Sequence, residues 1–210
     1  RDIEIAEEVG ATIHLCHCST RDTVKFVKAA KEKGLPVSAE VCPHHFTLTD
    51  EDIIEDDANF KMNPPLRSRA DVEALKDGLK SGIMGMISTD HAPHSKEEKE
   101  KSIKNAPFGI VGLETAFALT VTELLGEYLD MKSLVERMSL TPAKLLNNGR
   151  GTLKEGSVAD LVVADINEEY VIDSDKFLSK GKNTPFNGKK VRGKVLYTLC
   201  NGKLVFKEEK

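Results

Sequence analysis

The feature that most constrains the fold of this chain is the alternation of short apolar segments with amphipathic helices. Three segments are short and apolar, as buried strands are: 12–16, 36–41 and 84–88. Helices are predicted from apolar spacing at 20–33, 70–79, 112–126 and 131–138, and a short one from Thr141, with Thr141 as N-cap and Pro142 at its first position. Strands that alternate with helices are typical of βα units around a parallel sheet. The sequence therefore predicts an α/β fold with three βα units in residues 1–150.

The pattern changes near Gly151. Segment 156–165 is predicted to be a strand, and a β-hairpin is predicted where 195–199 and 203–206 flank Asn201-Gly202. Asn-Gly supplies the positive φ angles that a type I′ turn needs. Residues 151–210 are therefore predicted to form a small all-β unit.

Each predicted strand in the first part ends in side chains that can do chemistry. The first is followed by Cys16-His17-Cys18, the second ends in Glu40 and runs into His44-His45, and the third is followed by Asp90-His91. In a (β/α)₈ barrel the active site lies where the carboxyl ends of the strands meet. Loops after strands are often polar without any function, but histidine or aspartate at all three ends favours a site.

His17 and Asp90 are the candidate metal ligands. A neutral imidazole is a common zinc ligand, and a carboxylate at a strand end can bind a metal and also carry a proton. Cys16 and Cys18 flank His17 and suggest an alternative Cys-His-Cys site. Alternation along a strand points residues 16 and 18 away from residue 17, which argues against that alternative.

Two further segments could contact a substrate. Asn63 and Arg67 lie in a Pro-Pro loop, where an amide and a guanidinium suit a substrate with carboxylate or ring amide groups. Phe108-Gly109 precedes a predicted helix, and its glycine would let the backbone approach a ligand closely. The charged run 95–101 is interpreted as a solvated loop or short helix.

Composition narrows the classes of partner. The formal net charge of −4 argues against nucleic acid or an anionic membrane as the main partner. No apolar run approaches the ~20 residues that span a bilayer. The 4 cysteines show no disulfide framework, so a reducing, cytoplasmic compartment is expected.

Taken together, these segments resemble the bacterial-type (class I) dihydroorotases of the amidohydrolase superfamily. The motifs that carry the resemblance are HLCHCST at 14–20, EVCPHHF at 40–46, KMNPPLR at 61–67, STDHAPH at 88–94 and PFGIVGLET at 107–115. Segment 156–165 is similar to the strand with which amidohydrolases re-enter their small β-sandwich.

The resemblance implies a distorted (β/α)₈ barrel with two zinc ions, which interconverts L-dihydroorotate and N-carbamoyl-L-aspartate in pyrimidine synthesis. It implies that His17 is a ligand of one zinc and that Asp90 is a ligand of the other and the proton shuttle. Asn63, His94 and the backbone of Phe108 and Gly109 are implied to contact the substrate.

The sequence also departs from the family pattern. The family's first two ligands form a His-x-His pair, and the histidines here, at 14, 17, 44, 45, 91 and 94, contain none. A full barrel needs about 250 residues. We therefore expect the C-terminal half of the enzyme, with the last three βα units at 1–150 and part of the β-sandwich at 151–210. Alone it is expected to be inactive and to depend on the missing N-terminal half or on self-association. A hydantoinase-like or allantoinase-like hydrolase and a non-catalytic homologue are the alternatives.

Overall fold

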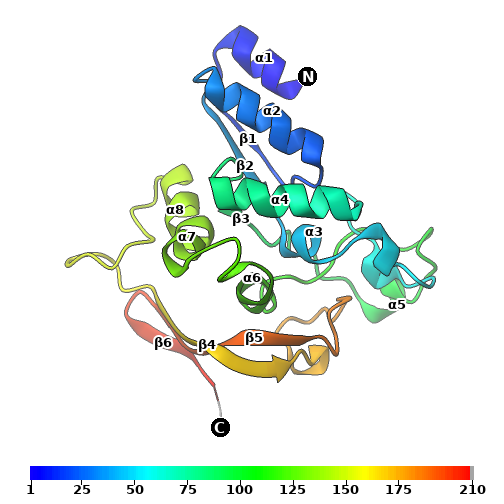
Figure 1. Ribbon diagram of the computed structural model, residues 1–210. Coiled ribbons are helices and arrows are strands. Elements are labelled where there is room, and N and C mark those ends of the chain that lie inside the picture. The colour runs from blue at the N-terminus through cyan, green and yellow to red at the C-terminus, as the bar shows by residue number, and fades with distance from the viewer. Residues whose placement is uncertain (209–210) are drawn as a thin grey trace.

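A computed structural model describes residues 1–208 as two three-stranded sheets joined by helices (Figure 1). The strands are β1 (Ile13–Leu15), β2 (Val37–Val41), β3 (Met86–Ile87), β4 (Leu161–Val171), β5 (Lys190–Cys200) and β6 (Lys203–Lys207). The α-helices are α1 (Asp2–Val9), α2 (Arg21–Glu32), α3 (Pro43–Thr47), α4 (Arg69–Ser81), α5 (Lys96–Lys99), α6 (Ala116–Leu124), α7 (Met131–Val135) and α8 (Thr141–Leu145). The α/β class expected from the sequence is confirmed.

The first sheet is parallel, in the order β1-β2-β3. Helix α2 begins where predicted, because the Thr20 side chain accepts a hydrogen bond from the Thr23 N–H at 3.2 Å. Its apolar face packs with that of α4 on the sheet, in a core that contains Val27, Val41 and Leu75, each 0% exposed. All three strands point their carboxyl ends to one edge of this sheet.

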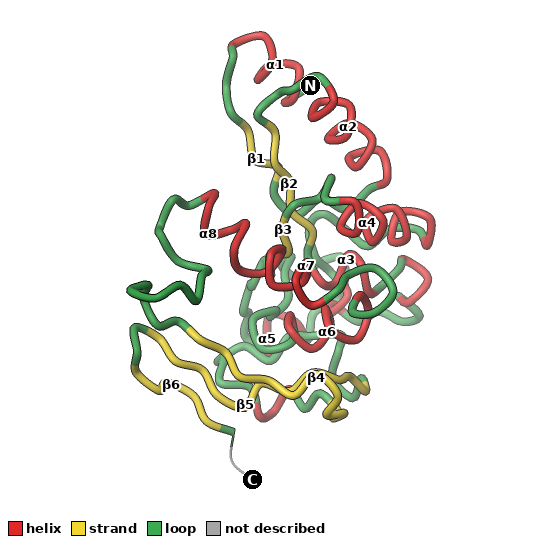
Figure 2. Tube along the Cα trace, turned by 60° about the vertical axis from the view of Figure 1, so that its left-hand side comes forward, coloured by secondary structure: helices red, strands yellow, loops and turns green. Residues whose placement is uncertain are grey.

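The second sheet is antiparallel, in the order β4-β5-β6. Asn201 and Gly202 have φ angles of 50° and 75°, so the predicted hairpin turn is confirmed. Figures 1 and 2 both place α6 between this sheet and the parallel one. Val121 and Leu124 of α6 belong to the core of the parallel sheet, whereas Leu119 packs with residues of the second.

The helical segment around Thr141 differs from the prediction. A π-helical turn, Glu136–Leu140, joins α7 to α8, and both Leu140 and Thr141 have helical backbone angles. Thr141 is therefore not an N-cap that begins a separate helix. Pro142, which has no N–H to donate, stands where the π-helical turn passes into α8.

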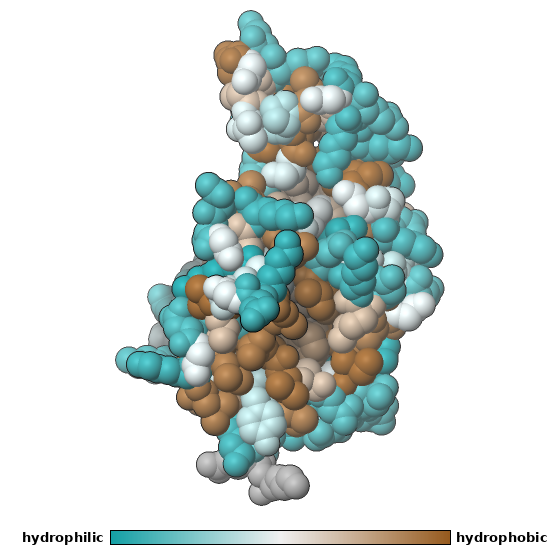
Figure 3. Space-filling view, turned by 90° about the vertical axis from the view of Figure 1, so that its left-hand side faces the viewer, coloured by the Kyte–Doolittle hydropathy of each residue, from teal (hydrophilic) through white to brown (hydrophobic). Residues whose placement is uncertain are grey.

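Apolar side chains gather on the face of the molecule toward which α8 and β6 lie (Figure 3). Strands β4 and β6 carry large exposed apolar residues, among them Val162, Val163, Leu204 and Val205. Exposed apolar area of this kind commonly marks a surface that another segment or chain covers. Among residues 1–208, no helix is long and apolar enough to cross a membrane.

Candidate active site

His17 and Asp90 are brought to the same edge of the parallel sheet, just beyond the carboxyl ends of β1 and β3. Both residues have positive φ angles, 37° and 47°, which side-chain-bearing residues rarely adopt. Strained backbone of this kind costs on the order of 1–3 kcal/mol and concentrates at functional sites. Each strand therefore ends in a sharp change of direction at a candidate ligand.

Glu40, near the end of the central strand β2, links these strand ends. Its carboxylate accepts hydrogen bonds from the Ser88 hydroxyl at 2.6 Å and from the His17 N–H at 3.2 Å. The His14 imidazole contacts the other carboxylate oxygen at 3.0 Å. Burial by itself raises the pKa of Glu40, but these hydrogen bonds outweigh it and leave the pKa below its usual value. Glu40 therefore stays ionised and fixes the His17 backbone.

The electrostatics at Asp90 suit a proton-accepting carboxylate. Burial raises its pKa, the neighbouring His17 opposes that shift, and the negative Glu40 adds to it, so the net pKa is raised. The Nδ1 atom of His17 is buried and has no hydrogen-bond partner among residues 1–208. A free imidazole nitrogen beside a carboxylate is a donor set that fits a divalent metal ion such as zinc.

Two other groups of potential ligands lie close together in the described part of the chain. The ligand atoms of His14, Cys16 and Glu40 lie within 4.8 Å of one another, as do those of Cys42, His44 and His45. Neither group joins Cys16, His17 and Cys18. The Cys18 thiol is buried and contacts the Leu15 carbonyl at 3.6 Å, whereas Cys16 is exposed. The alternation argument against a Cys-His-Cys site does not apply to these residues, because β1 ends at Leu15 and the two thiols differ in exposure.

The segments that carry the candidate substrate contacts are tied to each other. The Gly109 N–H donates to the Lys61 carbonyl at 2.9 Å, which places the Asn63 loop beside Phe108 and Gly109. The His94 imidazole contacts the Phe108 carbonyl at 2.9 Å. Asn63 and Phe108 are exposed, His94 is half-buried and Gly109 is buried. The four candidates thus share one cluster of loops.

The charged run 95–101 contains a residue that the solvated-loop interpretation missed. Lys99 is only 7% exposed, and its ammonium group donates to the carbonyls of Gly109, Pro107 and Lys61 at 2.9, 3.2 and 3.4 Å. Burial lowers the pKa of Lys99 to about 8. Its neighbours Lys96, Glu97 and Glu98 are exposed, so the sequence carried no signal that distinguished Lys99.

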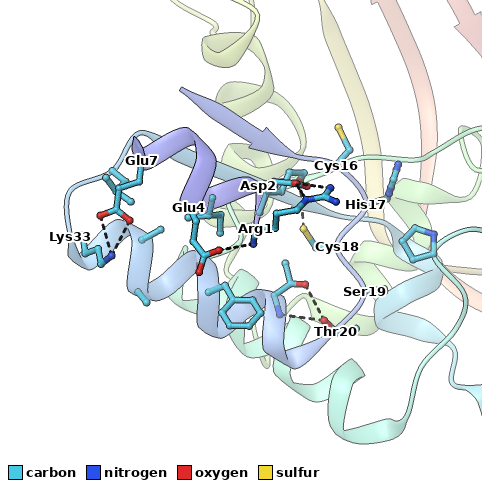
Figure 4. Close-up of a pocket in the computed structure, with 18 of the residues that line it drawn as sticks. Arg1, Asp2, Glu4, Glu7, Cys16, His17, Cys18, Ser19, Thr20 and Lys33 are labelled. Carbon is cyan, nitrogen blue, oxygen red and sulfur yellow. Dashed lines mark hydrogen bonds and ion pairs between the residues drawn. The ribbon is translucent and has the colours of Figure 1, made fainter. Parts of the chain in front are cut away.

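His17 also lines a cavity of about 630 Å³ between α1, α2 and the end of β1. Figure 4 shows His17, Cys18, Ser19 and Thr20 following one another along the segment that leaves β1 for α2. Arg67 lines the same cavity and donates to the Ser19 hydroxyl at 3.3 Å. The cavity lining does not include Asp90 or Asn63. Arg67 therefore lies with His17 rather than with the substrate-contact loops.

His44 and His45 form a buried pair behind the strand ends. Each is 2% exposed, and their rings meet edge to face at 4.2 Å between centroids. His45 contacts the Pro64 carbonyl at 2.8 Å, beside Asn63, whereas His44 Nε2 has no partner among residues 1–208. Burial lowers the pKa of His45 to about 4. The pKa of His44 lies well below its usual value, because His44 is buried and because His45 is close to it.

This pair predicts acid sensitivity. Below a pH of about 6.5 the unfolded chain protonates these histidines and the folded chain does not, so stability falls as pH drops. For His45 the loss of folding stability reaches roughly 3 kcal/mol by pH 4.

We expect His44→Leu to keep or raise stability at pH 7.5, because it removes an unpaired buried group. The same variant should lose less stability than wild type as the pH falls. Urea unfolding at pH 7.5 and 5, with a chelator present, measures this. His45→Leu is the matched variant, and it should lose stability at both pH values because it frees the Pro64 carbonyl. An unchanged acid loss in His44→Leu would contradict the prediction.

A model of the amidohydrolase family matches residues 2–205, and the chain belongs to that family. The dihydroorotase of Staphylococcus epidermidis is 49% identical over 212 aligned residues, which cover 100% of this chain and 50% of that protein. The dihydroorotase of Clostridioides difficile is 48% identical and is matched over 49% of its length.

Solved structures of hydantoinases share the fold of this chain. The L-hydantoinase (dihydropyrimidinase) of Arthrobacter aurescens matches with a TM-score of 0.93 at 30% identity, over 100% of this chain and 48% of that one. The chain thus spans about half the length of the relatives it matches.

Proposed function

We propose that this chain is part of a dihydroorotase, which hydrolyses L-dihydroorotate reversibly to N-carbamoyl-L-aspartate. The observation that carries the proposal is identity near one half, along the whole chain, to proteins named dihydroorotase. In the reaction a water oxygen bonds to the ring carbonyl carbon, the ring C–N bond breaks, and the nitrogen takes up a proton.

His17 and Asp90 are proposed to hold zinc in this reaction. Bound zinc lowers the pKa of water and polarises the carbonyl of a cyclic amide. Asp90 takes the proton from the attacking water and returns it to the leaving nitrogen, a role for which its raised pKa suits it. Glu40 accepts a hydrogen bond from the His17 N–H and so fixes the backbone from which the imidazole projects.

Asn63, His94, Phe108 and Gly109 are proposed to contact the substrate. The amide of Asn63 and the imidazole of His94 are suitable donors to its carboxylate. The second nitrogen of His94 lies 3.4 Å from the exposed Glu98 carboxylate, a long contact that a substrate carboxylate could displace. The Gly109 N–H and carbonyl are already bonded within the chain, so Gly109 contributes close approach rather than a hydrogen bond.

The proposal extends to the architecture. We assign residues 1–150 to the last three βα units of a (β/α)₈ barrel and 151–210 to part of a β-sandwich in a cytoplasmic enzyme. The rest of that enzyme would supply the remaining zinc ligands and cover the exposed apolar face. This explains how a chain without a His-x-His pair can align along its whole length with dihydroorotases.

A hydantoinase is the second candidate, because the L-hydantoinase fold superimposes closely. Its identity of 30% is well below the 49% of the dihydroorotase relative.

The test uses protein from the complete reading frame that encodes this chain, loaded with zinc. We expect it to hydrolyse L-dihydroorotate and to be at least a hundredfold less active on 5-substituted hydantoins. The 210-residue chain, assayed beside it, is expected to show no turnover. Hydantoin hydrolysis without dihydroorotate hydrolysis would replace the proposal with the second candidate.

A further inference from the structure

Asn183, in the connection between β4 and β5, reaches across to the loops of the parallel sheet. It is 6% exposed, and every polar group of its side chain is used. Its Oδ1 accepts from the His94 N–H at 3.0 Å, and its Nδ2 donates to the carbonyls of Ala92 and Gly109 at 3.0 and 3.1 Å. Its own carbonyl accepts from the Val111 N–H at 2.9 Å.

These hydrogen bonds join the two segments that carry candidate substrate contacts. One is the loop that begins at Asp90 and includes His94, and the other contains Gly109. Between them the backbone forms a short parallel bridge at His91 and Ile110, with the Ala92 N–H donating to the Ile110 carbonyl at 2.9 Å. The side chain of Asn183 extends this bridge toward His94, whose imidazole contacts the Phe108 carbonyl of the other segment.

The connection between β4 and β5 packs tightly against the loop that begins at Asp90. A Cβ atom added at Gly181 would lie 2.7 Å from Pro93 Cβ and 2.9 Å from Asn183 Oδ1. Such contacts are shorter than atoms tolerate, so the backbone of the connection lies directly on Pro93. The Gly109 carbonyl also accepts from the buried Lys99, which fixes the same segment from its other side.

We propose that Asn183 is a positioning residue, through which the antiparallel-sheet unit holds His94 and Gly109 in place for the substrate. The proposal rests on the proposed cyclic-amide hydrolysis. Only an amide supplies one acceptor and two donors of this size, so neither Asp nor a hydrophobic residue can reproduce all three side-chain bonds. Misplacement of a binding group by about 1 Å can cost about a hundredfold in rate.

The test compares Asn183→Ala and Asn183→Asp with Asn187→Ala, all in the complete zinc-loaded protein. Asn187 is a matched control, because its side chain also holds the β4–β5 connection, accepting from the Ser174 N–H at 2.9 Å. We expect KM to rise at least tenfold in Asn183→Ala, with a smaller change in kcat. Asn183→Asp should be intermediate, because it keeps the acceptor for His94. Asn187→Ala should lower Tm but leave KM within twofold of wild type.

A second readout does not depend on the substrate. Hydrogen exchange of peptides that cover 90–95 and 108–112 should be at least tenfold faster in Asn183→Ala and unchanged in Asn187→Ala. Unchanged exchange, or equal KM values in the Asn183→Ala and Asn187→Ala variants, would overturn the positioning role. If wild-type protein hydrolyses hydantoins instead of dihydroorotate, the proposed function is wrong but the positioning role of Asn183 is still testable. The KM comparison is then made with the hydantoin.

Discussion

Replacement of Asp90 with Asn is expected to lower kcat/KM for dihydroorotate at least a thousandfold in the complete protein. Asn keeps the size of the side chain and part of its hydrogen bonding, but it cannot take up a proton. General acid–base catalysis contributes about 10²–10⁴-fold, and a weakened metal contact adds to that loss. Steady-state kinetics in both directions of the reaction, with zinc in excess, measure the effect.

Asp77→Asn is the matched control. Asp77 is an exposed aspartate on α4 and lies outside the loops described above. We expect it to leave kcat/KM within twofold of wild type. Zinc content measured on both variants separates the two roles of Asp90, because a pure proton shuttle would leave the metal stoichiometry unchanged. More than a tenth of wild-type activity in Asp90→Asn would contradict both roles.

The elements of the parallel sheet could be predicted from sequence because the signals are local. The helical spacing of Val24 and Val27, the Thr20 cap and the positive φ of Gly34 all depend on residues close along the chain. The convergence of His17 and Asp90 was also predictable, since parallel strands share one carboxyl edge. The prediction that Thr141 is an N-cap was wrong, because a π-helical turn continues the preceding helix into α8. The capping propensity of threonine carries no information about such a turn.

The residues that support the site could not be predicted in the same way. Glu40 stands out as a charged residue in an apolar strand, which was a signal. Its three partners, however, lie 23 to 48 residues away in the sequence, and one of them is a backbone N–H. Lys99 lies in a charged run whose other members are solvated, and only the tertiary fold buries it. Asn183 contacts His94 across 89 residues. Such long-range contacts leave no periodicity in the sequence.

Gly109→Ala is expected to lower stability by about 3 kcal/mol or more, and kcat/KM about a hundredfold. Gly109 has a φ of 121°, a conformation that a residue with a side chain avoids. An added Cβ would also lie 2.4 Å from Ala92 Cβ, an atom fixed to the backbone that cannot rotate away. The Ala92 and Gly109 segments would have to separate, which would break the alignment of His94 with Phe108. Urea unfolding and steady-state kinetics of the complete protein measure the two effects.

Two further variants separate backbone strain from the collision. Gly34 has a φ of 77° and nothing within 4 Å of an added Cβ, so Gly34→Ala should cost only about 1–2 kcal/mol and leave kcat/KM unchanged. Ala92→Gly combined with Gly109→Ala removes the colliding atom and keeps the strain. The double variant should therefore recover most of the lost kcat/KM and only part of the lost stability, a coupling that independent sites do not show. If Gly109→Ala costs no more than Gly34→Ala, the two segments are not in contact at Gly109, and the substrate-contact cluster is not held together there.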